Sequence, residues 1–339
     1  MTQSLQGHLS IIRDPRQAGK VVHRMSDIVM LSICAMVGGA EGWLDIEEFG
    51  STHEEWFRAQ GMFSNGIPVD DTIARVMSML SPKAFQTAFI AWMKDVTALT
   101  HGEVIAVDGK TLRRSHDRKA RKAPLHMVSA FACSNGVVLG QERSEAKSNE
   151  ITAIPALLKL LALKGCIVTI DAMGCQKAIA KQIRQGKGDY VLAVKDNQRS
   201  LHEAIVDWFD SAQAHGLKYA PHEYYEQTDK GHGRIEVRRY WVSEDLSGLP
   251  APERWAGLRS IGMAENEIHQ GDKRTIERRY FITTLAANAQ QFAHAVRNHW
   301  GIENRLHWVL DMSFREDECR IRRGDGAEIL GVVRHIALN

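Results

Sequence analysis

The stretch VIAVDGKTLRRS, residues 104–115, marks the point at which the hydrophobic pattern of the chain changes its period. Before it, apolar residues recur at helical spacing, as in IARVMSML at residues 73–80. After it, short apolar runs rich in β-branched residues alternate with turns that contain glycine. We therefore expect a small all-α N-terminal domain over residues 1–97 and an α/β domain over residues 98–339.

Five short runs in the second part are typical of strands. Three of them follow one another at hairpin spacing, and the last two are separated by a helical stretch, which predicts a mixed sheet with helices on its faces. The five runs are VIAVD (104–108), HMVSAFA (126–132), GVVLGQ (136–141), IVTID (167–171) and YVLAV (190–194).

Residues 200–284 are expected to form a β-rich insertion in this α/β domain. Alternating polar and apolar residues predict strands at 234–242 and 278–285. A long final helix then begins at Asn288, because an asparagine followed three residues later by a glutamine is a capping-box pair.

The composition is that of an ordinary globular protein. Hydrophobic residues make up 44% of the 339 positions and charged residues 25%. No apolar run approaches the ~20 residues that a membrane-spanning helix needs, and the first residues show no secretory signal, so we expect a cytoplasmic protein. The five cysteines form no CxxC pattern, which argues against a zinc site and a disulfide framework.

The small net charge of +2 is unevenly distributed along the chain. Residues 1–97 carry eight basic and eleven acidic residues, so the excess of positive charge belongs to the second part. Its densest run, KTLRRSHDRKARK at 110–122, holds seven basic residues and one acidic one. Such a run is either a solvated face or a surface that contacts phosphate, and its position beside Asp108 favours phosphate.

Two carboxylates end apolar strands, Asp108 in VIAVDGKT and Asp171 in IVTIDAMG. A buried lone carboxylate is costly, so each must be solvated, paired or bound to a metal. The simpler interpretation is that each caps the segment that follows its strand. Because we expect both to lie side by side on adjacent strands of one sheet, a shared functional site is the stronger hypothesis.

Glu303 is the third candidate, because it occupies the core-facing stripe of the final helix, three residues after Trp300. The alternative is a buried ion pair with Arg297, His299 or His307. Asp311 is a competitor on the same helix, but at ~100° per residue it falls about 80° from Glu303 and should point off that face. The remaining competitors, Glu316 and Asp317, should lie beyond the end of the helix.

Three carboxylates on two strands and one helix suit two Mg²⁺ or Mn²⁺ ions, which act on phosphodiesters. A second basic segment, KGHGRIEVRRYW at 230–241, mixes arginines with Tyr240 and Trp241 and suits contact with nucleic acid. The residues that we expect to contact nucleic acid are Lys110, Arg113, Arg114, Arg118, Lys119, Arg121, Lys122, Lys195, His232, Arg234, Arg238 and Arg239.

Several long motifs together closely resemble the H-repeat-associated proteins, which belong to the DDE insertion-sequence transposases. The resemblance covers nearly the whole chain, including its helical N-terminal part. The motifs are AVDGKTLRRS (106–115), KSNEITAIP (147–155), TIDAMGCQKAIA (169–180), DYVLAVKDNQ (189–198) and RNHWGIENRLHWVLDMSF (297–314).

The resemblance implies an RNase H-like mixed sheet with flanking helices and a β-rich insertion at about 200–284. It also implies a catalytic triad of Asp108, Asp171 and Glu303 that holds two Mg²⁺ ions. The reaction would be hydrolysis of a strand at the end of the element, followed by attack of the freed 3′-hydroxyl on target DNA. The implied partners are DNA and further copies of the chain in a synaptic complex, in a nucleoid-associated location and without a membrane.

Related transposases carry a Tyr-x2-Arg-x3-Glu-x6-Lys pattern, whose offsets from Glu303 here hold Val296, His299 and Leu310. Arg297 and Lys195 are the expected substitutes for holding phosphate. The sequence stops where family members continue with a basic helical tail, so the second hypothesis is a catalytically inactive DNA-binding remnant with a truncated C-terminus. A metal-dependent small-molecule phosphatase ranks third, because it leaves the basic run without a role.

Overall fold

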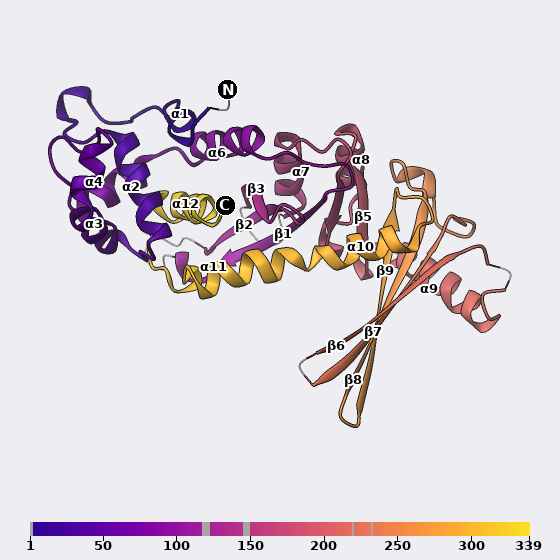
Figure 1. Cartoon of the computed structure of the whole chain (residues 1–339). Helices are drawn as coiled ribbons and strands as arrows, with labels where there is room; N and C mark the ends of the chain where they lie inside the picture. Colours follow the sequence, from indigo (N-terminus) through magenta and orange to yellow (C-terminus); the bar gives the residue numbers. More distant parts are fainter. Residues whose placement is uncertain (1–2, 117–122, 145–149, 219, 232) are drawn as a thin grey trace.

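The computed structural model describes residues 3–116, 123–144, 150–218, 220–231 and 233–339 (Figure 1). The part before Val96 is helical, as predicted. A proline at the first helical position and a serine cap start its last helix, and Ser81 Oγ accepts a hydrogen bond from the backbone N–H of Ala84. The helices are α1 (Leu5–Leu9), α2 (Met25–Val37), α3 (Trp43–Thr52), α4 (Glu54–Ala59), α5 (Asp70–Met79) and α6 (Pro82–Val96).

The second part is built on a nine-stranded sheet with the order β3-β2-β1-β4-β5-β9-β8-β7-β6. Strand β2 pairs antiparallel with β1 and with β3, whereas β4 pairs parallel with β1 and with β5. This order and these directions are those of an RNase H-like core, which confirms the expected fold. Its strands are β1 (Val104–Leu112), β2 (Leu125–Ala132), β3 (Val137–Ser144), β4 (Ile167–Ile170) and β5 (Asp189–Val194).

Strand β1 continues four residues beyond the predicted end at Asp108. Its pairing with β4 stops at Val107, but its pairing with β2 goes on to Leu112. Asp108 therefore lies inside a strand, at the point where one of its two neighbours ends. The apolar run alone predicted a shorter strand because Gly109, Lys110 and Thr111 interrupt its hydrophobic pattern.

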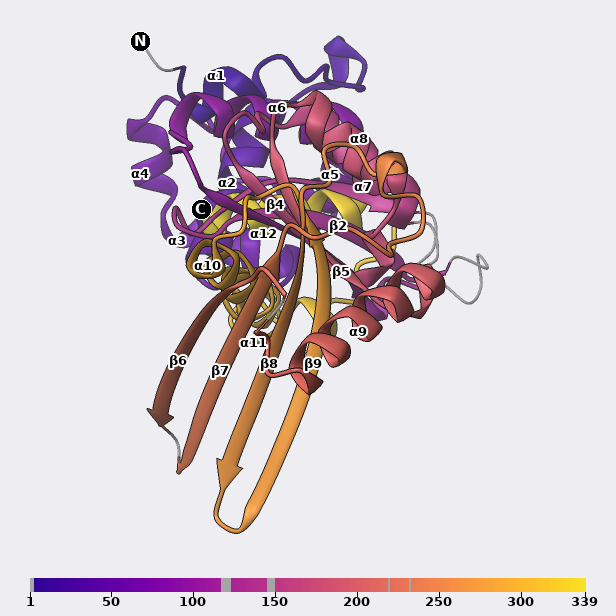
Figure 2. The same cartoon turned by 90° about the vertical axis from the view of Figure 1, so that its right-hand side faces the viewer.

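The insertion begins with helix α9 (Arg199–Ala214) and extends the same sheet, because β9 pairs antiparallel with β5. The predicted strand at 278–285 is longer at its start and ends at Thr283. The far ends of the four strands project away from the rest of the molecule (Figures 1 and 2). They are β6 (Glu223–Gly231), β7 (Arg234–Ser243), β8 (Ser260–Gln270) and β9 (Lys273–Thr283).

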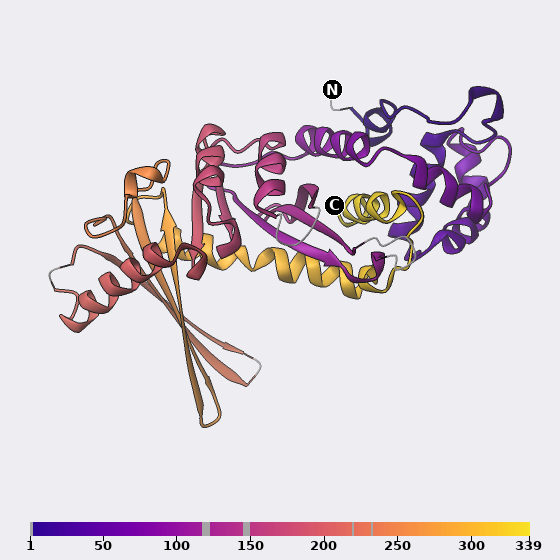
Figure 3. The same cartoon turned by 180° about the vertical axis from the view of Figure 1, so that it is seen from behind.

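Helices cover both faces of the sheet. On one face, α7 (Glu150–Leu160), α8 (Lys177–Gln185) and α9 bury an apolar core. On the other, α10 (Ala289–His299) lies along the sheet, and α12 (Gly326–Leu338) packs among the N-terminal helices (Figure 3). The helical part and the sheet therefore share one continuous core. Across the described ranges, no helix combines the length and apolar character needed to cross a bilayer.

The final helix begins as predicted, since Asn288 Oδ1 accepts a hydrogen bond from the backbone N–H of Gln291. It is not a regular α-helix throughout. A π-helical turn, Glu303–His307, separates α10 from α11 (Trp308–Met312). Such turns contain one more residue than an α-helical turn and often occur at functional sites.

Candidate active site

Asp108 and Asp171 lie side by side at the centre of the sheet. Val107 of β1 and Ile170 of β4 are partners in the parallel ladder, and the two aspartates are the residues that follow them. This confirms the predicted placement on adjacent strands. On the face of the sheet that carries the two aspartates, the Oγ1 of Thr169 and the Nδ1 of His299 in α10 are 3.1 Å apart.

A cavity of about 210 Å³ borders both aspartates, and Glu303 and Lys195 also line it. These four side chains come from β1, the end of β4, the π-helical turn and the end of β5. Four of the residues selected from sequence, separated by up to almost two hundred positions, are therefore neighbours around one cavity.

Negative charge in this cavity is poorly compensated. Burial raises the pKa of Asp108 to about 7, and repulsion from Asp171 and Glu303 adds to the rise, while a hydrogen bond from the backbone N–H of Gly109 opposes it. Burial also raises the pKa of Asp171. A bound cation would favour the charged form of both groups.

Asp171 also caps the segment after its strand, which was the simpler interpretation of this residue. Its Oδ1 accepts hydrogen bonds from the backbone N–H groups of Met173 and Gly174 at 3.0 and 3.3 Å. These hydrogen bonds fix the orientation of the Asp171 carboxylate, which still lines the cavity. The capping role and a role in a functional site are therefore compatible.

Glu303 differs from its predicted environment. Its side chain is exposed, and Ile302 and Leu306 take the buried positions of this part of the helix. The alternative of a buried ion pair is also wrong, because Glu303 forms no ion pair within the described residues. It reaches the cavity from the solvent side.

Asp311 does not point off the face that carries Glu303, contrary to the prediction. The extra residue of the π-helical turn takes up about one 100° step, so the expected offset of about 80° becomes about −20°. Asp311 Oδ1 consequently accepts a hydrogen bond of 2.6 Å from the Nζ of Lys110.

Lys110 is largely buried and ion-paired, whereas the prediction of a DNA contact requires an exposed side chain. Its side chain is 11% exposed, and its Nζ lies 2.6 Å from Asp311, 2.8 Å from Glu316 and 3.7 Å from Asp317. Strand alternation turns Lys110 towards the same face as Asp108, under the final helix. In the rest of the basic run, Arg113 and Arg114 are exposed, while Arg118, Lys119, Arg121 and Lys122 lie outside the described residues.

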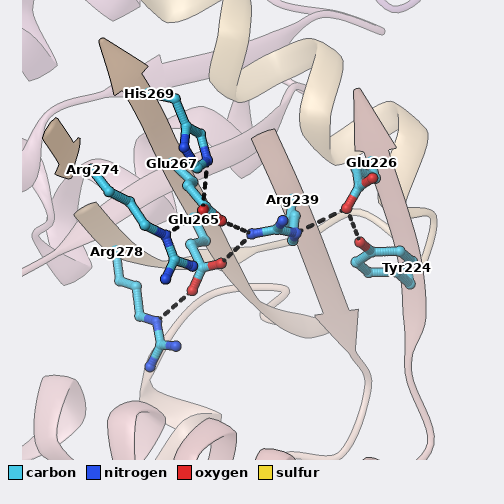
Figure 4. A network of polar contacts seen from close by, with 8 residues as sticks. All are labelled: Tyr224, Glu226, Arg239, Glu265, Glu267, His269, Arg274 and Arg278. Carbon is cyan, nitrogen blue, oxygen red and sulfur yellow. Dashed lines mark hydrogen bonds and ion pairs between the residues drawn. The ribbon is translucent and has the colours of Figure 1, made fainter. Parts of the chain in front are cut away.

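Arg238 and Arg239, also expected on DNA, are occupied by acidic partners on opposite faces of β7. Arg238 is buried and pairs with Asp229 and Glu236. Arg239 is at the centre of a network that includes Glu226, Glu265 and Glu267 (Figure 4). The sequence prediction missed these pairs because most of the partners come from neighbouring strands. His232 lies outside the described residues.

A second cavity, of about 310 Å³, adjoins the first between the insertion and α10. Arg279 and Trp300 line both cavities, and the guanidinium of Arg279 lies 4.4 Å from the centre of the Trp300 ring. Arg234 and Arg297 line the second cavity only. Arg279 was not among the residues selected from the sequence, although the alternation of residues along β9 places its side chain on the face that borders both cavities.

Two buried residues beside β1, His126 and Glu150, were also overlooked. His126 Nε2 lies 2.5 Å from Glu150 Oε1, and His126 Nδ1 lies 2.8 Å from the Oγ1 of Thr111. A Cβ at Gly109 would come within 2.5 Å of Glu150 Oε1 and of His126 Nε2, so a larger residue at this position would displace the pair. The motif KSNEITAIP (147–155), which contains Glu150, was the sequence signal that could have identified this pair.

Within the described ranges, no three His, Cys, Asp or Glu side chains already converge as a ready set of metal ligands. The two aspartates are fixed by the sheet, whereas Glu303 is an exposed side chain on a helix. The site therefore consists of a fixed pair of carboxylates and a third one at the rim of the same cavity.

The fold and this set of carboxylates agree with the sequence relationships of the chain, which belongs to the DDE transposases. Residues 100–339 match the family described as "Transposase DDE domain". Residues 6–93 match the family described as "DDE_Tnp_1-associated". The resemblance inferred from the motifs is thereby confirmed.

Among individual proteins, the chain is 48% identical to "Putative transposase YncI" of Escherichia coli O157:H7, over 99% of this chain and 87% of that protein. It is 46% identical to "H repeat-associated putative transposase YhhI" of Escherichia coli strain K12, over 99% and 90%. A cryo-EM structure of a piggyBac transposase synaptic complex with hairpin DNA aligns over 100% of this chain and 71% of that one. Its TM-score of 0.42 and 10% identity are too low to support an argument.

Proposed function

We propose that this protein is a DNA transposase that hydrolyses a phosphodiester bond at the end of an insertion sequence and joins the freed 3′-hydroxyl to target DNA. One observation supports this most directly. In a chain of the DDE family, Asp108, Asp171 and Glu303 come from three elements and line a single cavity. We assign these three side chains as the catalytic carboxylates.

The donor set suits a hard divalent cation. The candidate ligands are all carboxylate oxygens, and burial, together with repulsion from Asp171 and Glu303, raises the pKa of Asp108. Asp108, Asp171 and Glu303 would hold two Mg²⁺ or Mn²⁺ ions. When bound, such ions activate an attacking oxygen and stabilise the leaving one.

The rest of the site would hold the DNA. Lys195 and Arg297 are exposed, and in the described part of the chain neither forms an ion pair with an acidic side chain. Both are therefore available to phosphate oxygens, together with the exposed Arg114. Arg113 and Arg234 are also exposed, but they pair with Asp317 and Glu236 and would have to exchange these partners for phosphate. A synaptic complex would bring at least two copies of the chain to two element ends.

The test is an incubation of the purified protein with Mg²⁺ and labelled DNA that carries the ends of the element. We expect nicks at the element ends, and none with Asp108→Asn. Specific binding without nicks in Mg²⁺ or Mn²⁺ would instead support the second candidate, an inactive DNA-binding remnant.

A further inference from the structure

Lys110 is a buried cation on the strand that carries Asp108. The two residues are two positions apart in β1, so their side chains point to the same face of the sheet. The side chain of Lys110 is 11% exposed, and carboxylates lie at 2.6 and 2.8 Å from its Nζ. A cation buried in this way is costly unless its partners are held in place.

Its partners all belong to the segment that follows Glu303. Asp311 is in α11, eight residues after Glu303, and Glu316 begins the short helix Glu316–Glu318. Glu316 is itself buried and lies 3.6 Å from Arg334 of α12. Lys110 thus joins the strand of one proposed catalytic carboxylate to the helix of another.

The helix that carries Glu303 is fixed on both sides of it. Upstream, Phe292 and Val296 of α10 are buried in the core shared with the sheet. Downstream, Asp311 can meet Lys110 only because of the π-helical turn, since a regular helix would rotate Asp311 away by about 80°. The irregular turn and the ion pair therefore depend on each other.

We propose that Lys110 is a positioning residue, which holds the Glu303 helix in register with Asp108 and does not contact DNA phosphate. Loss of the Lys110 charge frees residues 303–312 to relax towards a regular helix and moves Glu303 relative to the two aspartates. The consequence is weaker binding of the divalent cation. This inference rests on the proposed function for the role of the three carboxylates.

The test compares Lys110→Met with the wild-type full-length protein in two measurements. The first is hydrogen exchange of the metal-free protein, in which we expect residues 303–312 to exchange faster in Lys110→Met. The second is Mn²⁺ binding, followed by the EPR signal of the free ion, for which we expect a dissociation constant raised about tenfold. Asp311→Asn should reproduce both effects, and adding it to Lys110→Met should cause little further change.

Arg315→Met is the matched control, because it removes an exposed, ion-paired cation from the same segment without touching β1. Unchanged exchange and unchanged Mn²⁺ affinity in Lys110→Met would overturn the inference. So would a loss of DNA affinity together with a salt slope reduced by about one, which identifies a phosphate contact. If Lys110→Met does not fold, the exchange of residues 303–312 and the Mn²⁺ affinity of Asp311→Asn test the inference in its place. A wild-type protein that binds no Mn²⁺ would contradict the proposed function. The hydrogen-exchange data would still test whether Lys110 holds the helix that carries Glu303.

Discussion

The Oδ2 of Asp108 lies 3.6 Å from the Nδ1 of His307, and both side chains are largely buried. Burial and, to a smaller extent, the charge of Lys110 lower the pKa of His307 to about 4, so the ring is neutral near pH 7. The imidazole therefore does not compensate the charge of Asp108, whose pKa is raised to about 7.

The metal-free protein should lose stability as the pH rises from 4 to 7. The folded state holds the Asp108 proton up to about pH 7, whereas the unfolded chain releases it near the ordinary aspartate pKa of 3.8. The free energy of unfolding in EDTA should therefore fall by at most ~4 kcal/mol over this interval. Urea unfolding at several pH values measures it, and Asp108→Asn should flatten the dependence. An equally steep fall in Asp108→Asn would assign the effect to other groups.

Divalent cations should stabilise the protein more at pH 8 than at pH 6. Binding competes with the Asp108 proton, which is largely absent at pH 8. A concentration one hundred times the dissociation constant adds ~2.7 kcal/mol to the free energy of unfolding. Thermal unfolding with Mg²⁺ or Mn²⁺ at the two pH values measures the difference. The same shift in Asp108→Asn and Asp171→Asn would show that the cation binds elsewhere.

Glu303→Gln should abolish strand cleavage without affecting folding or DNA binding. Glu303 is exposed and has no ion pair in the described residues, so its loss should change the free energy of unfolding by less than ~0.5 kcal/mol. Cleavage assays, thermal unfolding and DNA binding in Ca²⁺ separate these effects. Glu318→Gln, which alters another exposed glutamate after the helix, is the control. Normal cleavage by Glu303→Gln would remove this residue from the site.

DNA affinity should depend on salt through Lys195 and Arg297. Each phosphate contact contributes about 0.9 to the slope of log affinity against log salt, so Lys195→Gln with Arg297→Gln should reduce the slope by about 2. Fluorescence anisotropy with DNA of several sequences measures this, and the loss should be similar for all of them. If the slope of the double variant equals that of the wild type, these two side chains do not contact the backbone.

Arg239→Gln should destabilise the insertion and leave the salt slope unchanged. Arg239 pairs with Glu265 and Glu267, both buried, and its loss leaves their charges without a central partner (Figure 4). The hydrogen bonds from Arg274 and Arg239 lower the pKa of Glu267 to about 2, so its contribution to stability is complete above about pH 4.5 and is lost as the pH falls towards 2. Thermal unfolding should show a lower Tm. A reduced slope of log DNA affinity against log salt would instead show that Arg239 contacts the DNA backbone.

The sequence by itself determined the elements and their order. Hydrophobic period is a local property, so the change near residue 104 separated the helical part from the sheet, and the cap at Asn288 gave the start of the final helix. The two apolar runs before Asp108 and Asp171 also predicted that these residues are neighbours. The β1 to β4 ladder confirms that placement.

Tertiary structure decided which charges are free. Lys110 and Asp311 are 201 positions apart, and only the packing of the final helix on β1 joins them. The same holds for Arg239, whose partners Glu265 and Glu267 come from the next strand. A run of basic residues has the same sequence signature whether its charges meet acidic partners or solvent. Those partners are set by strand register and by the π-helical turn, which depend on contacts between distant segments and not on local periodicity.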